Sequence, residues 1–467
     1  MGFVGEILVV QKMEMRRILR KCMSVGTLNV YQGYGNRILH YYSTKTKPEL
    51  TSIRYNIKRG PYSKLTDEHV NFFERLLDRN RVITDPDECD GYNIDFANTV
   101  RGVITCEAGC VLEDLDNHLS TFGLMMPLDL GAKGSCLIGG NVSTNAGGLR
   151  LLRYGNLHGN ILGIEAVKAN GDIINSLNGL KKNNTGFHLK HLFIGSEGTL
   201  GIVTKVAIQC PPLPKAINVA FLGLNSFDNV LKIYHLAKKE LGEILSSCEM
   251  MDKLSIDVST QLLGLQNPLA IDGCDHDFYV LLETSGSHMA HDEEKLNAFV
   301  EKVLNDNIVQ DGTLTSDTAK MKNIWALRER ISEGVLREGY VFKYDVSLPL
   351  PYFYKVVEVL RERLRDPRII RISGYGHIGD GNIHIQVSIP TYHEDIASQL
   401  EPFIFEYISS LSGSVSAEHG IGFKKTKYLH LSRTQSEIEL MKHLKLTMDP
   451  KGILNPYKVL YPINTSE

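Results

Sequence analysis

The chain has 467 residues, of which 43% are hydrophobic and 22% charged, and its formal net charge is −3. This length allows two or three domains with an ample core. The near-neutral charge argues against a nucleic-acid-binding surface, and no apolar run approaches the length of a membrane span.

The N-terminal stretch differs in composition from the rest. From Met15 to Pro48 it contains no acidic residue, while Arg and Lys recur among Leu, Ile, Tyr and Ser. This composition is typical of a mitochondrial transit peptide cleaved near RILHYYS, and the alternative is a disordered basic tail. We assign residues 1–48 to this segment.

Residues 49–212 are expected to form the first folded domain. The pattern predicts a helix at Asp67–Leu77, a short strand at Val103–Cys106 and an amphipathic helix at Val111–Phe122. The eight cysteines of the chain include no CxxC, which suits a reducing compartment. Cys106 and Cys110 allow a redox pair, although core packing explains them as well.

Glycines are densest between Pro127 and Gly155, where we expect loops rather than a regular element. A hairpin with Asn170-Gly171 at its turn is predicted at Ile164–Ile174, and a second glycine cluster runs into a strand at Gly201–Ile208. The sequence contains neither GxGxxG entering a helix nor a Walker loop. Two such clusters favour an extended phosphate-bearing cofactor, and the alternative is that the glycines serve turns alone.

CPPLP at Cys210–Pro214 indicates a domain boundary. Beyond it strands are predicted at Asn218–Leu224 and Phe278–Glu283 and helices at Phe227–Leu245 and Glu294–Leu304. The expected unit, residues 213–412, is α+β, with helices on one face of an antiparallel sheet.

A further helix is predicted at Lys322–Glu338, with Arg328 and Ser332 on one face. A solvated arginine on a surface helix is the simpler interpretation of Arg328. Lys343 alternates with apolar neighbours along a strand, so it can point into a site.

The stretch GYGHIGDGNIH, Gly374–His384, carries His377 and His384 seven residues apart. Their odd offset places them on opposite faces of a straight strand, but the intervening glycines permit a turn that brings both to one side. With Glu418 of AEHG they form a two-histidine, one-carboxylate set suited to a divalent metal. A glycine-rich hairpin with surface histidines is the alternative. The C-terminal segment, 413–467, contains a helix that opens with a capping box of Thr434 and Glu437.

Several of these stretches together resemble the flavin-dependent D-2-hydroxy-acid dehydrogenases, in particular those that act on D-2-hydroxyglutarate. The resemblance runs from about residue 103 to the end and rests on PLDLGAKGSCLIGGNVSTNAGGLR, LFIGSEGTLGI, CEMMD, WALRERISE, GYGHIGDGNIH, SAEHGIGF and DPKGILNP. It implies an FAD-binding domain of the vanillyl-alcohol oxidase (PCMH) type at 49–212, an α+β substrate-binding cap and a helical C-terminal segment. The overall fold class is α+β.

The resemblance also implies the functional residues. The FAD-lining positions are Pro127, Asp129, Gly134, Ser135, Gly139, Gly140, Asn141, Asn145, Gly147, Glu197, Gly201, Ile202 and Asn455. The zinc ligands are His377, His384 and Glu418, and the substrate contacts are Arg328, Ser332, Lys343, Gln386 and His419. His419 is expected to be the general base. The electron acceptor is expected to be an electron-transfer flavoprotein in the mitochondrial matrix.

The chain departs from the family pattern at three places. Ser332 stands for threonine and Gln386 for asparagine, and the longer Gln386 is expected to shift its hydrogen-bonding group outward. After Gly102 several dozen residues of the family are missing, including a glycine-rich loop that wraps the FAD pyrophosphate. The expected reaction is metal-assisted oxidation of D-2-hydroxyglutarate to 2-oxoglutarate by FAD. The alternatives are a D-lactate or glycolate dehydrogenase, a catalytically impaired chain that binds FAD poorly, and a zinc-binding protein without FAD.

Overall fold

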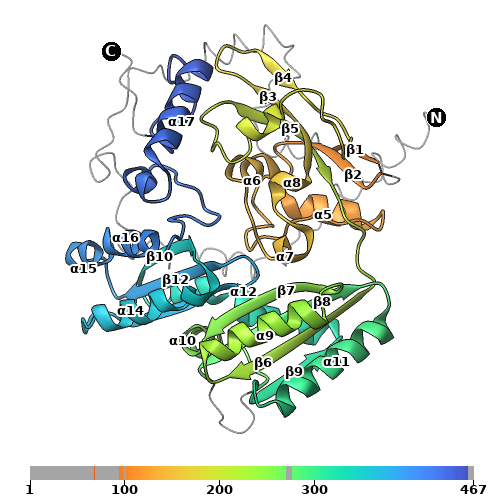
Figure 1. Ribbon diagram of the computed structural model, residues 1–467, viewed down its shortest axis with the longest axis vertical. Coiled ribbons are helices and arrows are strands. Elements are labelled where there is room, and N and C mark those ends of the chain that lie inside the picture. The colour runs from red at the N-terminus through yellow and green to blue at the C-terminus, as the bar shows by residue number, and fades with distance from the viewer. Residues whose placement is uncertain (1–67, 69–93, 99–100, 270–275, 461–467) are drawn as a thin grey trace, which may run out of the picture. The chain divides into compact units, whose positions relative to one another are not determined.

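The computed structural model describes residues 68, 94–98, 101–269 and 276–460, with residues 94–98 described by their backbone (Figure 1). The chain divides into two compact units, Met1–Glu49 and Leu50–Glu467, and the structure below belongs to the second. The predicted transit segment and, apart from Glu68, the predicted helix at Asp67–Leu77 lie outside the described residues.

The first sheet, here called the N-terminal sheet, has five strands. Their order is β1 (Ile94–Asn98), β2 (Val103–Glu107), β5 (Ile202–Gln209), β3 (Ile161–Val167) and β4 (Ile173–Asn175), and every neighbouring pair is antiparallel. The predicted hairpin is confirmed, since β3 pairs with β4 and Gly171 at its turn has φ +88°. A positive φ of this kind strongly favours glycine.

The two faces of the N-terminal sheet are covered unequally. One face carries a core in which Ile104, Val206 and Ile208 pack with helix α5 (Leu112–Ser120) and its neighbours. On the other face the buried residues are Val103, Leu162 and Ala207, and the polar pairs Lys205–Glu107 and Thr204–Glu165 lie among the same strands. Among the described residues, one face therefore carries the larger apolar core, and the other combines a small apolar cluster with these polar pairs.

The glycine-rich stretch contains a helix that sequence reasoning did not expect. α6 runs from Ile138 to Thr144, buries Ile138 and Val142, and ends at Asn145, which has φ +51°. Burial of these two apolar side chains outweighs the low helix propensity of the glycines between them. Two single-turn helices follow, α7 (Leu151–Tyr154) and α8 (Leu157–Asn160).

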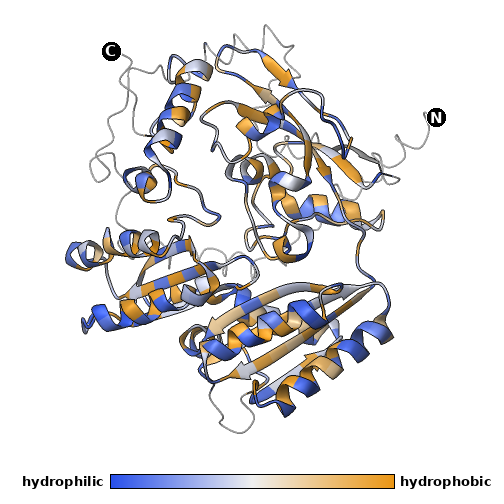
Figure 2. Cartoon of the chain, in the orientation of Figure 1, coloured by the Kyte–Doolittle hydropathy of each residue, from blue (hydrophilic) through white to orange (hydrophobic). Residues whose placement is uncertain are grey.

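The second sheet, here called the C-terminal sheet, has seven strands, and the neighbouring pairs are antiparallel. The order is β10 (Tyr340–Ser347), β12 (Asn382–Ile389), β11 (Arg371–His377), β7 (Leu245–Asp252), β8 (Phe278–Gly286), β6 (Ala216–Leu224) and β9 (Asp311–Thr315). Its strands are rich in apolar residues, whereas α9 (Phe227–Glu240) and α11 (Met289–Asn305) alternate between hydrophilic and hydrophobic residues (Figure 2).

Helices cover both faces of the C-terminal sheet, so the expectation of helices on one face is wrong. Along β6, Ala220 and Leu222 belong to the core beneath α9 and α11, whereas Val219 and Phe221 pack on the opposite side. The first core also takes α14 (Lys355–Arg363), α15 (Glu394–Leu400) and α16 (Phe403–Ser410). The second takes α10 (Lys253–Asp257), the π-helical turn Val258–Leu262, α12 (Thr318–Glu329) and α13 (Ile331–Val335). Both faces of β6 are apolar because both are buried.

Three predicted helices of this region have different bounds in the structure. α9 ends at Glu240, because Leu245 already begins β7. α11 begins at Met289, earlier than expected, and the helix expected at Lys322–Glu338 is divided at Arg330 into α12 and α13. The capping box is confirmed at the start of α17 (Gln435–Met448), where Thr434 and Glu437 bond each other's backbone. In the described part of the chain no helix has the length and apolar character that crossing a bilayer requires.

Candidate active and metal site

The polar side chains of the C-terminal sheet are aligned by its register. In an antiparallel sheet, residues directly opposite each other project from the same face. One row pairs Asp345 with His384 and His384 with Tyr375, and the next pairs Asn382 with His377 and His377 with Glu249. A third row pairs Lys343 with Gln386. Strands from distant parts of the chain thus present one polar face.

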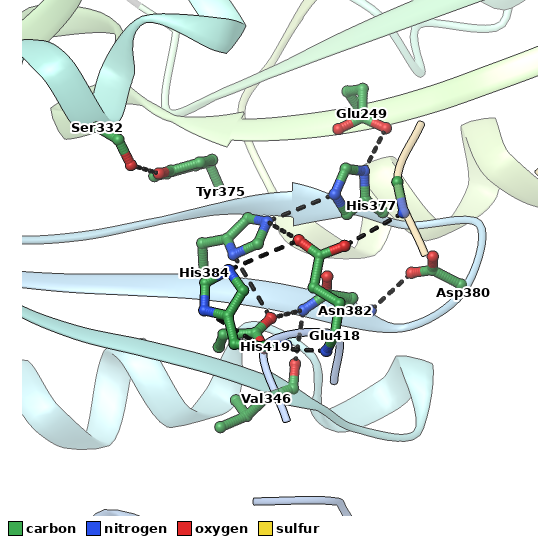
Figure 3. Close-up of polar contacts among 12 residues, drawn as sticks. Glu249, Ser332, Val346, Tyr375, His377, Asp380, Asn382, His384, Glu418 and His419 are labelled. Atoms are coloured by element: carbon green, nitrogen blue, oxygen red, sulfur yellow. Dashed lines mark hydrogen bonds and ion pairs between the residues drawn. The ribbon is translucent and has the colours of Figure 1, made fainter. Parts of the chain in front are cut away.

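His377 and His384 belong to the two strands of one hairpin, which resolves the question of their odd spacing. β11 ends at His377, the turn has Gly381 at φ +76°, and β12 begins at Asn382. The two Nε2 atoms lie 3.4 Å apart, and Oε1 of Glu418 is 3.8 Å from Nε2 of His384. The three side chains converge on one point, close enough together to hold a metal ion (Figure 3). The glycines permit the turn, as expected.

The loop that carries Glu418 and His419 is fixed by a buried carboxylate, Asp345. Its Oδ2 accepts hydrogen bonds from the backbone N–H groups of Glu418 and His419, both at 2.9 Å. Its Oδ1 accepts from Nδ2 of Asn382 at 2.8 Å. Asp345, Glu418 and His419 also lie within metal-binding distance of one another. Because both oxygens of Asp345 already accept these bonds, the residue acts as a support for the loop.

Glu249 of β7 lies behind His377, on the side away from Glu418 (Figure 3). Its Oε1 is 2.9 Å from Nδ1 of His377, and its Oε2 accepts from Nε of Arg328, also at 2.9 Å. Burial alone raises the pKa of Glu249, but the charges of His377 and Arg328 outweigh it and lower this pKa to about 2. A carboxylate on Nδ1 keeps the proton there and leaves the Nε2 lone pair for a metal.

The two imidazoles differ in their electrostatics. Burial lowers the pKa of His377, but Glu249 outweighs burial and raises this pKa to about 9. Burial and the neighbouring His377 hold the pKa of His384 well below its usual range. His384 is therefore neutral at physiological pH, which is the form that binds metals.

Arg328, Ser332 and Gln386 meet at Tyr375, although the division at Arg330 separates the first two. The guanidinium of Arg328 lies 4.7 Å from the centre of the Tyr375 ring, and Ser332 Oγ is 2.7 Å from its hydroxyl oxygen. Nε2 of Gln386 donates to both hydroxyls at 2.7 Å. Arg328 is only 6% exposed, so the interpretation as a solvated surface arginine is wrong.

The side chain of Gln386 is buried, and its amide is bonded to Ser332 and Tyr375. Lys343 is exposed on the strand beside it. His419 is the most exposed member of the cluster, with 65% of its side chain accessible, and its Nδ1 lies 3.7 Å from Oδ2 of Asp345.

The positions expected to line FAD lie on the loops and short helices beside the N-terminal sheet, except that Ile202 begins β5 and Asn455 follows α17. Gly134, Ser135, Gly140, Ile202 and Asn455 are exposed, whereas Pro127, Gly139, Asn141 and Gly201 are buried. Asn141 Oδ1 is buried, and no hydrogen-bond partner for it occurs among the described residues. Exposed backbone beside an unpaired amide oxygen fits a polar cofactor.

Two of the expected cofactor glycines have a packing explanation. A Cβ at Gly139 would lie 2.5 Å from the Cβ of Ala108, and one at Gly201 would lie 2.5 Å from the Phe193 ring. Both approaches are too close for any larger residue. At Gly140 nothing lies within 4 Å of an added Cβ, so packing gives no reason for this glycine.

Glu197 and Asn455 link the N-terminal loops to the C-terminal segment. The carboxylate of Glu197 accepts hydrogen bonds from the backbone N–H groups of Ile421, at 2.6 Å, and Gly422, at 2.7 Å. Nδ2 of Asn455 donates to the Glu197 carbonyl oxygen. Asn145, Glu197 and Asn455 all have positive φ, between 41° and 52°. Such backbone strain in residues other than glycine concentrates at functional sites.

Sequence reasoning missed Glu249, Tyr375, Asp345 and Asn382 as parts of this cluster. Glu249 had a signal, because it is a carboxylate in the strand LSSCEMMD, which is otherwise nearly free of charge. A charge at such a position needs a partner. The partner of a lone buried carboxylate cannot be identified from sequence without the strand register.

Comparisons with known proteins agree with this architecture. Two family models match, the FAD binding domain over residues 87–176 and the C-terminal domain of FAD linked oxidases over residues 213–459. The mitochondrial D-2-hydroxyglutarate dehydrogenase of Rattus norvegicus is 43% identical, with 92% of each chain covered. A putative mitochondrial D-lactate dehydrogenase of Schizosaccharomyces pombe is 46% identical over 77% of this chain and 70% of its own.

The rat alignment is longer than the part of this chain that it covers. It extends over 498 positions, whereas 92% of this chain is only about 430 residues, so several dozen positions have no counterpart here. The fission-yeast alignment extends over 369 positions and covers 77% of this chain, which is about 360 residues. Few of its positions therefore lack a counterpart in this chain. The number of unmatched positions in the rat alignment agrees with the several dozen residues expected to be missing.

The fold has a counterpart among solved structures. The 4-ethylphenol oxidase from Gulosibacter chungangensis superposes with a TM-score of 0.57 at 17% identity, covering 79% of this chain and 78% of that one. The architecture is therefore α+β with an FAD-binding domain of the vanillyl-alcohol oxidase type. With two matching family models and a relative 43% identical over nearly its whole length, the chain belongs to the FAD-linked oxidases, in the family of the mitochondrial D-2-hydroxyglutarate dehydrogenases.

Proposed function

We propose that this chain oxidises D-2-hydroxyglutarate to 2-oxoglutarate with FAD and a divalent metal, and that FAD binding is its weakest step. The observation that carries the proposal is the convergence of His377, His384 and Glu418 beside Arg328 in a chain of this family. We infer that these three residues would hold the metal. Zn²⁺ is commonly bound by neutral imidazoles and a carboxylate, and here Glu249 orients the imidazole of His377.

When bound, Zn²⁺ held by His377, His384 and Glu418 would supply a Lewis acid for the substrate hydroxyl, and FAD would supply a hydride acceptor. We assign the hydroxyl proton to His419, which is exposed next to Glu418 and held through its backbone by Asp345. Its accessibility allows the proton to leave to solvent.

The cations are assigned to the two substrate carboxylates. Arg328 presents a guanidinium that Glu249 and the Tyr375 ring hold in place, and an oriented guanidinium suits a carboxylate. We assign Lys343 to the distal carboxylate, because it lies opposite Gln386 on the strand next to the cluster. Ser332 would bind a substrate oxygen, and Gln386 would hold Ser332 and Tyr375 in place. The residues proposed to line FAD are those near α6, together with Glu197, Gly201, Ile202 and Asn455.

The setting proposed for this reaction is the mitochondrial matrix, with an electron-transfer flavoprotein as acceptor. The support is the mitochondrial naming of the relatives and the basic composition of residues 15–48. The proposed organisation is a transit segment at 1–48, an FAD-binding domain at 49–212, a cap at 213–412 and a C-terminal segment at 413–467.

A second candidate is oxidation of a monocarboxylic D-2-hydroxy acid such as D-lactate. The fission-yeast relative carries that name, and Gln386 departs from the asparagine expected here. Because Gln386 is bonded to Ser332 and Tyr375, it is not free to reach a distal carboxylate. Its amide thus favours neither substrate, and Lys343 becomes the residue that distinguishes them.

The test is a dye-reduction assay at saturating FAD and Zn²⁺, with D- and L-2-hydroxyglutarate, D-lactate and glycolate. It compares this chain with a restored chain, in which the corresponding segment of the rat relative is inserted after Gly102. We expect turnover of D-2-hydroxyglutarate and not of L-2-hydroxyglutarate. Turnover should be faster in the restored chain, which should also show the absorbance of bound flavin. No turnover in either chain, or equal turnover of both enantiomers, would refute the proposal, and a colourless zinc-binding protein would favour a role without FAD.

A further inference from the structure

Glu249 is the most completely buried carboxylate beside the candidate site, and all four contacts of its side chain are polar. It is 1% exposed. Oε1 lies 2.9 Å from Nδ1 of His377 and accepts from Ser247 Oγ at 3.2 Å. Oε2 accepts from Nε of Arg328 at 2.9 Å and lies 2.8 Å from its Nη2. One oxygen therefore faces the proposed metal ligand and the other the proposed carboxylate-binding cation.

We propose that Glu249 is a positioning residue that orients His377 for the metal and Arg328 for a substrate carboxylate at the same time. The inference rests on the proposed function and adds to it a connection between the two halves of the site. In this proposal Glu249 would act through His377 and Arg328, which its carboxylate contacts, and not on the metal or the substrate directly.

The register of the sheet gives Glu249 this double role. β7 and β11 are neighbours, and His377 lies directly opposite Glu249, so the imidazole and the carboxylate share one face. α12 packs over the same face and brings Arg328 to the other oxygen. The bond to Nδ1 determines which nitrogen of His377 carries the proton, and Nε2 then keeps its lone pair toward His384 and Glu418.

A carboxylate is the side chain that can satisfy both partners, because it has two acceptor oxygens. In Glu249→Gln the amide has one acceptor and one donor. If its N–H₂ faces His377, Nδ1 must accept and the proton moves to Nε2, which can then no longer bind a metal. If its N–H₂ faces Arg328, two donors meet and the guanidinium is displaced. In either orientation one contact is lost and the other is made to a neutral amide oxygen, which is a weaker acceptor than a carboxylate oxygen, so both halves of the site are weakened.

The alternative is that Glu249 merely stabilises the fold by neutralising Arg328. A buried ion pair can often be replaced by apolar residues of similar volume without loss of stability. The double variant Glu249→Met with Arg328→Met removes both charges, so it separates stability from the hydrogen bond to His377. Asp252→Asn is the matched control, since Asp252 lies on the same strand, is also 1% exposed and pairs with Arg361 away from the metal ligands.

The experiment measures Zn²⁺ affinity of the full chain and its variants by competition with a chromophoric chelator, alongside thermal unfolding. His384→Ala gives the background from other sites. Glu249→Gln and the double variant should both bind Zn²⁺ about 10- to 100-fold more weakly than wild type, even where the double variant unfolds at the wild-type temperature. Asp252→Asn should retain wild-type affinity. At saturating Zn²⁺, 2-oxoglutarate should bind Glu249→Gln about tenfold or more weakly.

The outcomes separate this inference from the proposed function. A wild-type chain with no more Zn²⁺ affinity than His384→Ala would refute the metal site itself, and the positioning role with it. If Glu249→Gln binds Zn²⁺ as tightly as wild type, only the positioning role is overturned. The same holds if the double variant regains both wild-type stability and wild-type Zn²⁺ affinity. If Glu249→Gln binds 2-oxoglutarate as tightly as wild type, the part of the proposal in which Glu249 orients Arg328 is overturned.

Discussion

The two sheets of this protein differ in how their faces are packed. The C-terminal sheet has seven strands with a core on each face, and the candidate metal ligands and cations project from it or from segments anchored to it. The N-terminal sheet has five strands, and its second face buries Val103, Leu162 and Ala207. Among the described residues, the sheet that carries the substrate half is therefore packed on both faces, whereas the sheet beside the cofactor half has one large apolar core and one small one.

The distribution of exposed apolar side chains shows the same difference. Among the described residues, 101–213 contain eight large hydrophobic side chains that are exposed, with Phe187 at 92% and Ile173 at 64%. The more than twofold longer stretch 214–460 contains six. The described part of 101–213 therefore exposes more large apolar side chains per residue than the rest of the described chain. We propose that a folded segment after Gly102 would cover some of them.

The largest effect is expected from inserting that segment. FAD carries a pyrophosphate that backbone amides must meet, and each amide contact to a charged group lost with the segment costs roughly 1.5–3 kcal/mol. We expect this chain to bind FAD orders of magnitude more weakly than the restored chain, to turn over D-2-hydroxyglutarate slowly and to aggregate. Flavin absorbance after gel filtration, with light scattering, measures these properties.

A control for this prediction is an insertion of equal length but unrelated, flexible sequence after Gly102. It should improve neither FAD retention nor solubility, because only a folded segment covers apolar surface. If the chain as it stands is yellow, soluble and fully active, then the N-terminal sheet is complete and the contrast between the two sheets is wrong.

The second prediction is that the C-terminal half binds its metal even when the N-terminal half holds no FAD. Because the three metal ligands lie outside the N-terminal sheet, Zn²⁺ should bind one ion per chain even without FAD. His384→Ala should lose most of it, since two ligands remain of three. Elemental analysis after dialysis measures this, and stoichiometric metal in the variant would refute the assignment. In the restored chain, chelation should stop turnover and leave the flavin bound.

Much of this half could be predicted from the sequence because its signals are local. Glycines between His377 and His384 predict the hairpin, and the capping box at Thr434 predicts the start of α17. The partner of His377 could not be predicted, since Glu249 lies 128 residues earlier and meets it through the pairing of β7 with β11. Local propensity also misplaced the helix α6, where burial of Ile138 and Val142 overrides the glycines.

The third prediction concerns specificity within the complete half. If Lys343 binds the distal carboxylate, Lys343→Met should weaken D-2-hydroxyglutarate by roughly 2–5 kcal/mol in kcat/KM. D-lactate, which lacks that group, should be affected much less. Steady-state kinetics of the restored chain with both substrates measures the difference, and Lys343→Arg is the control that keeps the charge. Equal losses for both substrates would place Lys343 elsewhere.

The smallest effect is expected where the two halves are joined. Glu197 accepts hydrogen bonds from the N–H groups of Ile421 and Gly422, next to the loop of Glu418 and His419. Glu197→Gln keeps one acceptor oxygen and its size, so it should lose about one charge-assisted bond, roughly 1.5 kcal/mol for this half-buried group. A small drop in unfolding temperature should accompany a lower FAD affinity, while Zn²⁺ affinity stays at the wild-type value because Asp345 still holds Glu418. Thr434→Ala, which weakens the cap of α17 and removes no hydrogen bond of Glu197, should lower stability similarly without changing FAD affinity. Loss of Zn²⁺ in Glu197→Gln would show that the metal site depends on the N-terminal half after all, and the contrast between a complete and an incomplete half would then no longer hold.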